Sequence, residues 1–203
     1  MDITVITPEV KNILPSPRRI LARAGSRPER DMDFEHEVKD ALRALSRLAR
    51  PKGFYANMKI VSQDENRIIT RDFIINSNDM ARKLKGAEVL SVLMATIGAG
   101  PEEECHRLER IKEHTRAFFL DAAASEMTEE LLRLVHRQVA EKMPGFRGTA
   151  RYAPGYGDFS LEHQKSILSL LGGEKTGVKI TESFMLLPRK STTGVVAWIR
   201  QNS

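Results

Sequence analysis

A run of seven residues, Arg151 to Gly157 (RYAPGYG), combines backbone features that suit the wall of a ligand site. Pro154 fixes its own backbone angle and favours an extended conformation at Ala153. Gly155 has no side chain and Ala153 has a very small one, so a ligand can lie against bare backbone here. The same residues also fit an ordinary turn before a helix, and turn chemistry alone leaves both interpretations open.

Three longer side chains in this run add specific chemistry. Arg151 offers a planar guanidinium group that suits a carboxylate. Tyr152 and Tyr156 offer ring faces for stacking and hydroxyl groups for polar contacts. Together these side chains predict a site for a small molecule that carries a carboxylate and a ring.

Glu126 is a second candidate for ligand binding. It continues a helical stripe of apolar or small residues that begins at Phe119 and includes Ala122 and Ala123. A carboxylate at the end of such a face can accept a hydrogen bond from a ligand hydroxyl or ammonium group. The alternative is a solvated acid beside the glutamates that follow it, and the stripe alone does not decide between the two.

Other kinds of site are disfavoured. Residues 99–104 (AGPEEE) follow a strand pattern as a phosphate-binding turn would, but a third glycine is missing and three glutamates would repel phosphate. Pro101 instead predicts the start of a helix. The five histidines lack metal-ligand spacing, and the single cysteine, Cys105, excludes a cysteine zinc site or a disulfide framework. We therefore expect no metal site and no catalytic residue.

Composition limits the partners and the location of the chain. Its 203 residues include 32 Lys and Arg and 27 Asp and Glu, a formal net charge of +5. The basic residues are interleaved with acidic ones and only 6% of residues are aromatic, which argues against nucleic-acid binding. The longest apolar run, residues 89–100, is too short to span a bilayer, and the acidic N-terminus is unlike a signal peptide. We expect no membrane partner and a cytoplasmic location.

The patterns predict a single unit over residues 1–203, in three parts. Residues 1–31 are rich in proline and form an arm with a short helix that ends at Gly25. For residues 32–100 we expect a helix over 34–50, a hairpin of strands over 54–61 and 67–75, a short helix over 77–85 and a strand over 88–98.

The third part, residues 101–203, holds the candidate sites. Residues 101–142 show helical spacing throughout and predict two consecutive helices, because roughly 40 residues exceed the usual helix length. Ser160 is predicted to cap a helix over 161–171, and strands are expected over 177–188 and 192–200. The fold class is therefore α+β, with a mixed or antiparallel twisted sheet flanked by long helices.

Two of these segments, taken together, resemble a known family. RYAPGYG, followed after a helix by residues 177–196 (GVKITESFMLLPRKSTTGVV), is similar to the C-terminal activation domain of cobalamin-dependent methionine synthase. Its pattern is R-x-A-P-G-Y, a helix and a hairpin containing a T-E-S motif. The resemblance covers residues 119–199 well and the first hundred residues only loosely.

The resemblance implies binding of S-adenosylmethionine in a shallow groove, with its methyl sulfonium presented to a corrinoid held by another module. It assigns ligand contacts to Arg151, Ala153, Gly155 and Tyr156, and to Glu126 on the preceding long helix. The family's acidic contact near the N-terminus has no placed equivalent in this sequence. Its C-terminal tyrosine has no direct equivalent; Trp198 is one candidate for that position, although nothing in the sequence requires it.

The sequence has no D-x-H-x-x-G corrinoid motif and no cysteine cluster, so the resemblance implies an accessory component rather than a complete methionine synthase. It would serve a separate cobalamin-binding methionine synthase, whose inactive Co(II) corrinoid is reduced by a flavodoxin or ferredoxin type donor and remethylated by S-adenosylmethionine. The alternatives are an S-adenosylmethionine-binding scaffold without methyl transfer, an activator of another corrinoid methyltransferase, and an unrelated basic interaction protein.

Overall fold

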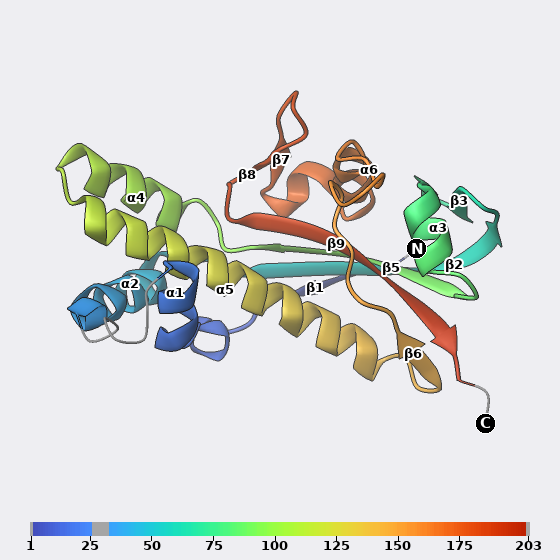
Figure 1. The fold of residues 1–203 in the computed structure, drawn as a ribbon, viewed down its shortest axis with the longest axis horizontal. Helices are drawn as coiled ribbons and strands as arrows, with labels where there is room; N and C mark the ends of the chain where they lie inside the picture. Colours follow the sequence, from blue (N-terminus) through green and yellow to red (C-terminus); the bar gives the residue numbers. More distant parts are fainter. Residues whose placement is uncertain (1, 26–32, 202–203) are drawn as a thin grey trace.

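A twisted antiparallel sheet forms the centre of the computed structural model, which describes residues 2–25 and 33–201 (Figure 1). The sheet has seven strands in the order β4-β3-β2-β5-β9-β6, and β1 pairs with the first half of β2. Its strands are β1 (Ile3–Ile6), β2 (Lys52–Gln63), β3 (Arg67–Thr70), β4 (Ile74–Asn76), β5 (Val89–Thr96), β6 (Phe146–Gly148) and β9 (Ser191–Arg200). A separate small hairpin is formed by β7 (Lys179–Ile180) and β8 (Leu186–Leu187).

Six α-helices surround this sheet in the described part of the chain. They are α1 (Pro17–Arg23), α2 (Glu35–Leu48), α3 (Asn78–Lys83), α4 (Gly100–Arg110), α5 (His114–Glu141) and α6 (His163–Leu170). Two short 3₁₀ helices, η1 (Val10–Ile13) and η3 (Gly173–Thr176), complete the elements. Figure 1 shows α5 running along one face of the sheet with α1, α2 and α4 packed on it, while α6 and the β7–β8 hairpin lie on the opposite side.

Strand β5 shows how the sheet separates two apolar cores. Leu93 and Ala95 face the core beneath α5, whereas Val92 and Met94 face the core beneath α6. Because successive side chains of a strand point to opposite faces, a central strand covered on both faces must be apolar throughout. This explains why residues 89–97 are mostly apolar; the two polar residues among them, Ser91 and Thr96, are buried and accept hydrogen bonds from Trp198 and Ser191, respectively.

Most predicted elements are confirmed. The α+β class, the helix after the arm, the hairpin after it and the break of residues 101–142 into two helices all match the structure. The short helix in the arm also forms and ends just before Gly25, but part of the arm lies outside the described residues. Of the two sheet types expected, the antiparallel one is observed, because all described strand pairs are antiparallel.

Two predicted strands are wrong in extent. Residues 67–75 form two strands, because the Thr70 hydroxyl and backbone bind Phe73 and close a turn between them. Residues 177–188 form the β7–β8 hairpin, because the Thr181 hydroxyl accepts from the backbone of Met185 across a turn. Helix α6 begins at His163, two residues later than expected.

Two strands were missed. Three residues after α5 form β6, which pairs with the C-terminal part of β9. The arm contributes β1, which pairs with residues 53–56 of β2. Four residues between charged and proline-containing segments carry little local signal, so this strand depends on its partner rather than on its own pattern.

Candidate functional site

The RYAPGYG run lies between two neighbouring cavities, both of which are lined by Ala153. The first has a volume of about 450 Å³, and its lining includes Glu129, Arg151 and Tyr156. The second has a volume of about 320 Å³ and lies towards α6 and the β7–β8 hairpin. The two cavities also share Thr192 and Thr193 of β9, and together they form a groove along the end of this strand.

The run is held in place at both ends. At its start, Tyr152 exchanges two backbone hydrogen bonds with Val195 of β9, with N···O distances of 2.9 and 2.7 Å. Further along, the Gly155 amide donates to the Phe159 carbonyl at 2.7 Å, and Gly155 adopts a φ of +97°, which strains residues with a side chain. The backbone around Ala153 is therefore fixed before any ligand arrives.

Strand β9 leaves part of its edge open beside this run. The backbone N–H and C=O of Val195 point away from β5 towards Tyr152. Since these groups alternate in direction along a strand, those of Thr193 point to the same side. The RYAPGYG run no longer follows β9 at Thr193, and among the described residues no backbone group pairs with Thr193 on this side of the strand. The groove thus offers unpaired backbone donors and acceptors to a ligand.

Arg151 reaches the groove by crossing β9 at Gly194. A Cβ atom at position 194 would lie 3.0 Å from Cγ and 3.2 Å from Cδ of Arg151, so the glycine provides the space for the arginine stem. The guanidinium Nη2 then donates to Oε2 of Glu129 on α5 at 2.8 Å. This ion pair is partly exposed at the cavity wall. Arg151 and Glu129 can exchange their contact with each other for contacts with a ligand that carries both a negative and a positive group.

Glu126 lies elsewhere. It is only 8% exposed, its Oε1 accepts from Nε of Arg23 on α1, and its Oε2 lies 4.0 Å from Arg133. Glu126 lines neither of the two cavities. The structure therefore brings Arg151, Ala153 and Tyr156 together in the first cavity but places Glu126 against the arm.

Glu129 is a groove residue that the sequence motifs did not identify. It lies three residues after Glu126, and residues at this spacing share one side of a helix. The only available signal was therefore that several glutamates followed the apolar stripe. Which of them meets Arg151 depends on where β9 crosses α5, and a helical pattern does not contain that information.

The tyrosines and the tryptophan differ in their access to the groove. Tyr156 is 69% exposed at the rim, whereas Tyr152 is half-buried against β9 and lines the first cavity. Trp198 is 2% exposed, and its indole N–H donates to Ser91 at 2.7 Å in the core. Trp198 therefore lines neither cavity and is no counterpart of a groove tyrosine.

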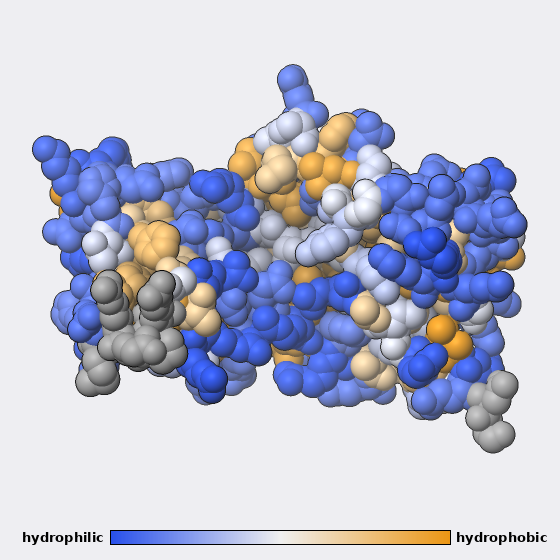
Figure 2. Space-filling view, viewed as in Figure 1, coloured by the Kyte–Doolittle hydropathy of each residue, from blue (hydrophilic) through white to orange (hydrophobic). Residues whose placement is uncertain are grey.

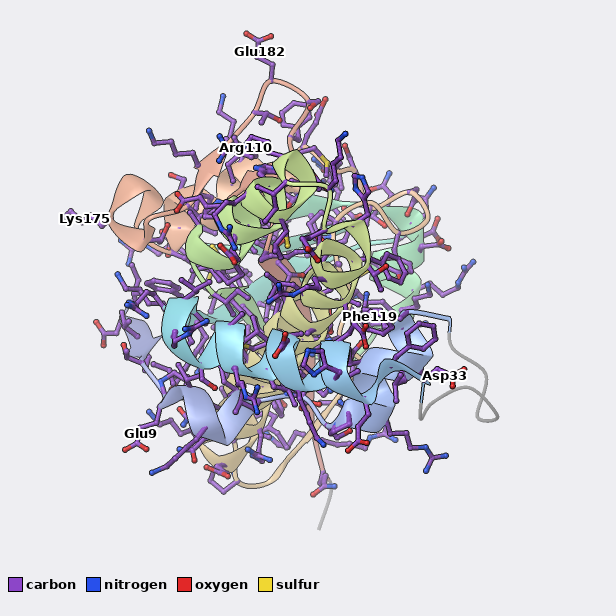
Figure 3. The ribbon with its side chains drawn as sticks, turned by 90° about the vertical axis from the view of Figure 1, so that its left-hand side faces the viewer. Glu9, Asp33, Arg110, Phe119, Lys175 and Glu182 are labelled. Atoms are coloured by element: carbon purple, nitrogen blue, oxygen red, sulfur yellow. The ribbon has the colours of Figure 1, made fainter. Side chains whose placement is uncertain are left out.

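The surface around the second cavity is apolar. Met185, which lines this cavity, is 55% exposed, and Leu187 next to it is 43% exposed. Figure 2 shows apolar side chains gathered over α6 and the β7–β8 hairpin. Glu182 stands at the tip of this hairpin and points away from the body of the molecule (Figure 3).

His136 lines neither cavity, but its pKa is affected by Arg151. The ring of His136 on α5 lies 6.0 Å from that of Trp198 in an edge-to-face arrangement. Burial lowers the pKa of His136, and the positive charge of Arg151 lowers it further. His136 therefore favours its neutral form beside the Arg151–Glu129 pair.

Metal clusters and membrane-spanning helices are both absent from the part of the chain that the structure describes. Within residues 2–25 and 33–201, no three His, Cys, Asp or Glu side chains gather closely enough to hold a metal ion. In the same ranges, no helix has the length and apolar character needed to cross a membrane.

Comparisons with known proteins give the family. The model for the activation domain of vitamin B12 dependent methionine synthase matches residues 54–202, and the chain belongs to this family. Its fold is similar to that in the crystal structure of the MetH reactivation domain bound to AdoHcy, with a TM-score of 0.74 and 17% sequence identity. That similarity covers 100% of this chain and 80% of the other. No curated protein matches the sequence.

Proposed function

We propose that this chain binds S-adenosylmethionine in the groove beside Ala153. The observation that carries this proposal is the Arg151–Glu129 ion pair, which lies next to an unpaired strand edge. The α-amino acid end of S-adenosylmethionine carries a carboxylate and an ammonium group. Arg151 can pair with the carboxylate while Glu129 takes the ammonium group, so both charges keep a partner when the ligand binds. The AdoHcy bound in the structurally similar MetH reactivation domain supports this class of ligand.

The other residues predicted from the sequence can contact the remaining groups of S-adenosylmethionine. Ala153 allows the ligand to approach the backbone, and the open edge at Thr193 offers hydrogen bonds to its ribose or base. Gly155 lines neither cavity, and its proposed contribution is the turn, with a φ of +97°, that positions Ala153 and Tyr156. Tyr156 stands exposed at the rim, where it can border the methyl group. Glu126 is a second acidic contact in this proposal, and the ligand can bind it only after the ion pair between Glu126 and Arg23 has opened.

We further propose that the bound ligand serves the reductive remethylation of a Co(II) corrinoid held by a separate cobalamin-dependent methionine synthase. The sulfonium supplies the methyl group, and a flavodoxin or ferredoxin type protein supplies the electron. Arg151, Glu129 and the backbone of Ala153 hold the donor at a fixed position and orientation, which is the chain's contribution to the rate. Met185 and Leu187 offer an apolar rim for the corrinoid protein.

Calorimetric titration with S-adenosylmethionine tests the first proposal. Arg151→Met and Glu129→Gln should each weaken binding about tenfold to a hundredfold, the effect of losing a charged hydrogen-bond partner. Glu126→Gln measures the second acidic contact, and a loss smaller than that of Glu129→Gln is expected. Absence of S-adenosylmethionine binding by the wild-type protein, both with and without a cobalamin-bound methionine synthase, would contradict the proposal.

A second experiment tests the role in remethylation. A methionine synthase without its own activation domain is brought to the Co(II) state and mixed with this chain, S-adenosylmethionine and a reduced flavodoxin. We expect the Co(II) absorbance to disappear only in the complete mixture. Ligand binding with an unchanged Co(II) spectrum would favour the scaffold alternative, and reaction with a different corrinoid methyltransferase only would identify another partner.

A further inference from the structure

Lys83 is a groove residue that lies outside both sequence motifs. It is the last residue of α3, and it lines the first cavity together with Arg151 and Glu129. Its ammonium nitrogen lies 5.1 Å from the centre of the Tyr152 ring, within the range of a cation–π contact. This contact places the positive charge of Lys83 directly beside the residue that follows Arg151.

Helix α3 is attached to the ligand-binding run at its other end. The Asp158 carboxylate accepts from the Ser77 hydroxyl and from the backbone amides of Asn78 and Asp79, with the Asn78 bond at 2.7 Å. These bonds satisfy the free amides at the start of α3. Since Asp158 directly follows Gly157, the last residue of the run, its bonds connect the run to the helix that carries Lys83.

The charges of the first cavity do not balance without a ligand. Arg151 and Lys83 are two cations, whereas Glu129 is the single acid that lines the cavity. Glu129 is paired with Arg151, and in the described part of the chain no carboxylate forms an ion pair with Lys83. The excess positive charge favours a negatively charged group at this end of the groove.

We propose that Lys83 is a second contact for the carboxylate of bound S-adenosylmethionine. This inference rests on the proposed function of the groove. The carboxylate is held between Arg151 and Lys83, both of which line the first cavity.

Ligand chemistry isolates this role. Lys83→Met removes the charge but keeps an unbranched side chain over Tyr152, and it should weaken S-adenosylmethionine binding about fivefold, as expected for a partly exposed ion pair. The analogue in which the carboxylate is replaced by hydrogen should bind the wild type and Lys83→Met with equal affinity. Lys83→Arg should retain most of the affinity for S-adenosylmethionine.

Lys85→Met is the matched control. It makes the same change of charge two residues away, where the side chain lines a different cavity with Gln63 and Arg82, and it should leave both affinities unchanged. The Lys83 inference fails if Lys83→Met leaves S-adenosylmethionine binding unchanged or weakens both ligands equally. When the wild type binds S-adenosylmethionine and Arg151→Met does not, each of these two results contradicts only the role of Lys83. Absence of binding by the wild type would instead contradict the proposed function itself.

Discussion

The stem of Arg151 crosses β9 over the backbone of Gly194, at a distance that leaves little room for a side chain. Gly194→Ala should therefore displace Arg151 from Glu129 and weaken S-adenosylmethionine binding about threefold to tenfold, for a crowding cost of roughly 1 kcal/mol. Calorimetric titration measures the affinity and thermal unfolding measures the stability. The double variant Gly194→Ala/Arg151→Ala is the control. Adding Gly194→Ala to Arg151→Ala should cost less stability than adding it to the wild type, because only the Tyr152 carbonyl, 3.3 Å from the new Cβ, still crowds it. An equal cost in both backgrounds would show that the crowding does not involve the arginine.

The Asp158 cap of α3 predicts a specific dependence of stability on pH. The Ser77 hydroxyl and the Asn78 and Asp79 amides hold the pKa of Asp158 below its usual value of 3.8. A lowered carboxyl pKa contributes stability above that usual value, and this contribution disappears as the pH falls through the folded-state pKa. Asp158→Asn should therefore lower the Tm at neutral pH and flatten its decline below pH 3.8. Asp72→Asn, at an exposed turn, should change neither, and identical curves for the two variants would contradict the cap.

Cys105 should be unreactive in the folded protein. It is 6% exposed, and burial raises the pKa of its thiol to about 11, with a further contribution from Asp121. The reactive thiolate is therefore scarce at pH 8. Iodoacetamide should label the protein in urea but leave the folded protein unmodified by mass spectrometry. Labelling of the folded protein at the rate of the unfolded chain would show that the α4–α5 contact opens readily.

His136 reports on the charge of Arg151. Burial and the neighbouring guanidinium both lower the pKa of His136 from its usual 6.5, so the unfolded chain binds a proton more readily and stability from this group declines as the pH falls below 6.5. Arg151→Met should raise the His136 pKa in an NMR titration. Arg137→Met, on the adjacent exposed position of α5, should have a smaller effect. An unchanged pKa in Arg151→Met would mean that burial alone determines it.

Sequence patterns predicted those helices and strands that are determined by neighbouring residues in the chain. The apolar spacing over residues 101–142, the proline and glycine breaks and the run at residues 151–157 gave most helices, most strands and the position of the groove. Contacts between distant segments were not predictable in this way. Strand β1 exists because β2 pairs with it, and Lys83 enters the groove because Asp158 holds α3 beside residue Tyr152.

The choice between Glu126 and Glu129 illustrates the same limit. Both are acids on one side of α5, and the sequence offers no reason to separate them. In the structure Arg23 of the arm engages Glu126, and Arg151 engages Glu129. Each pairing joins residues more than twenty positions apart, so only the packed arrangement of α1, α5 and β9 determines which acid faces the groove.

The open edge of β9 at Thr193 has a consequence for how this family can change over time. Hydrogen bonds to main-chain groups are available whatever side chain the strand carries, provided that the strand keeps its path. These hydrogen bonds therefore do not depend on the side chain at position 193, whereas Val195, Val196 and Trp198 of the same strand are buried and constrained by the core. The similar fold of a protein with 17% sequence identity is compatible with changes at positions outside the core.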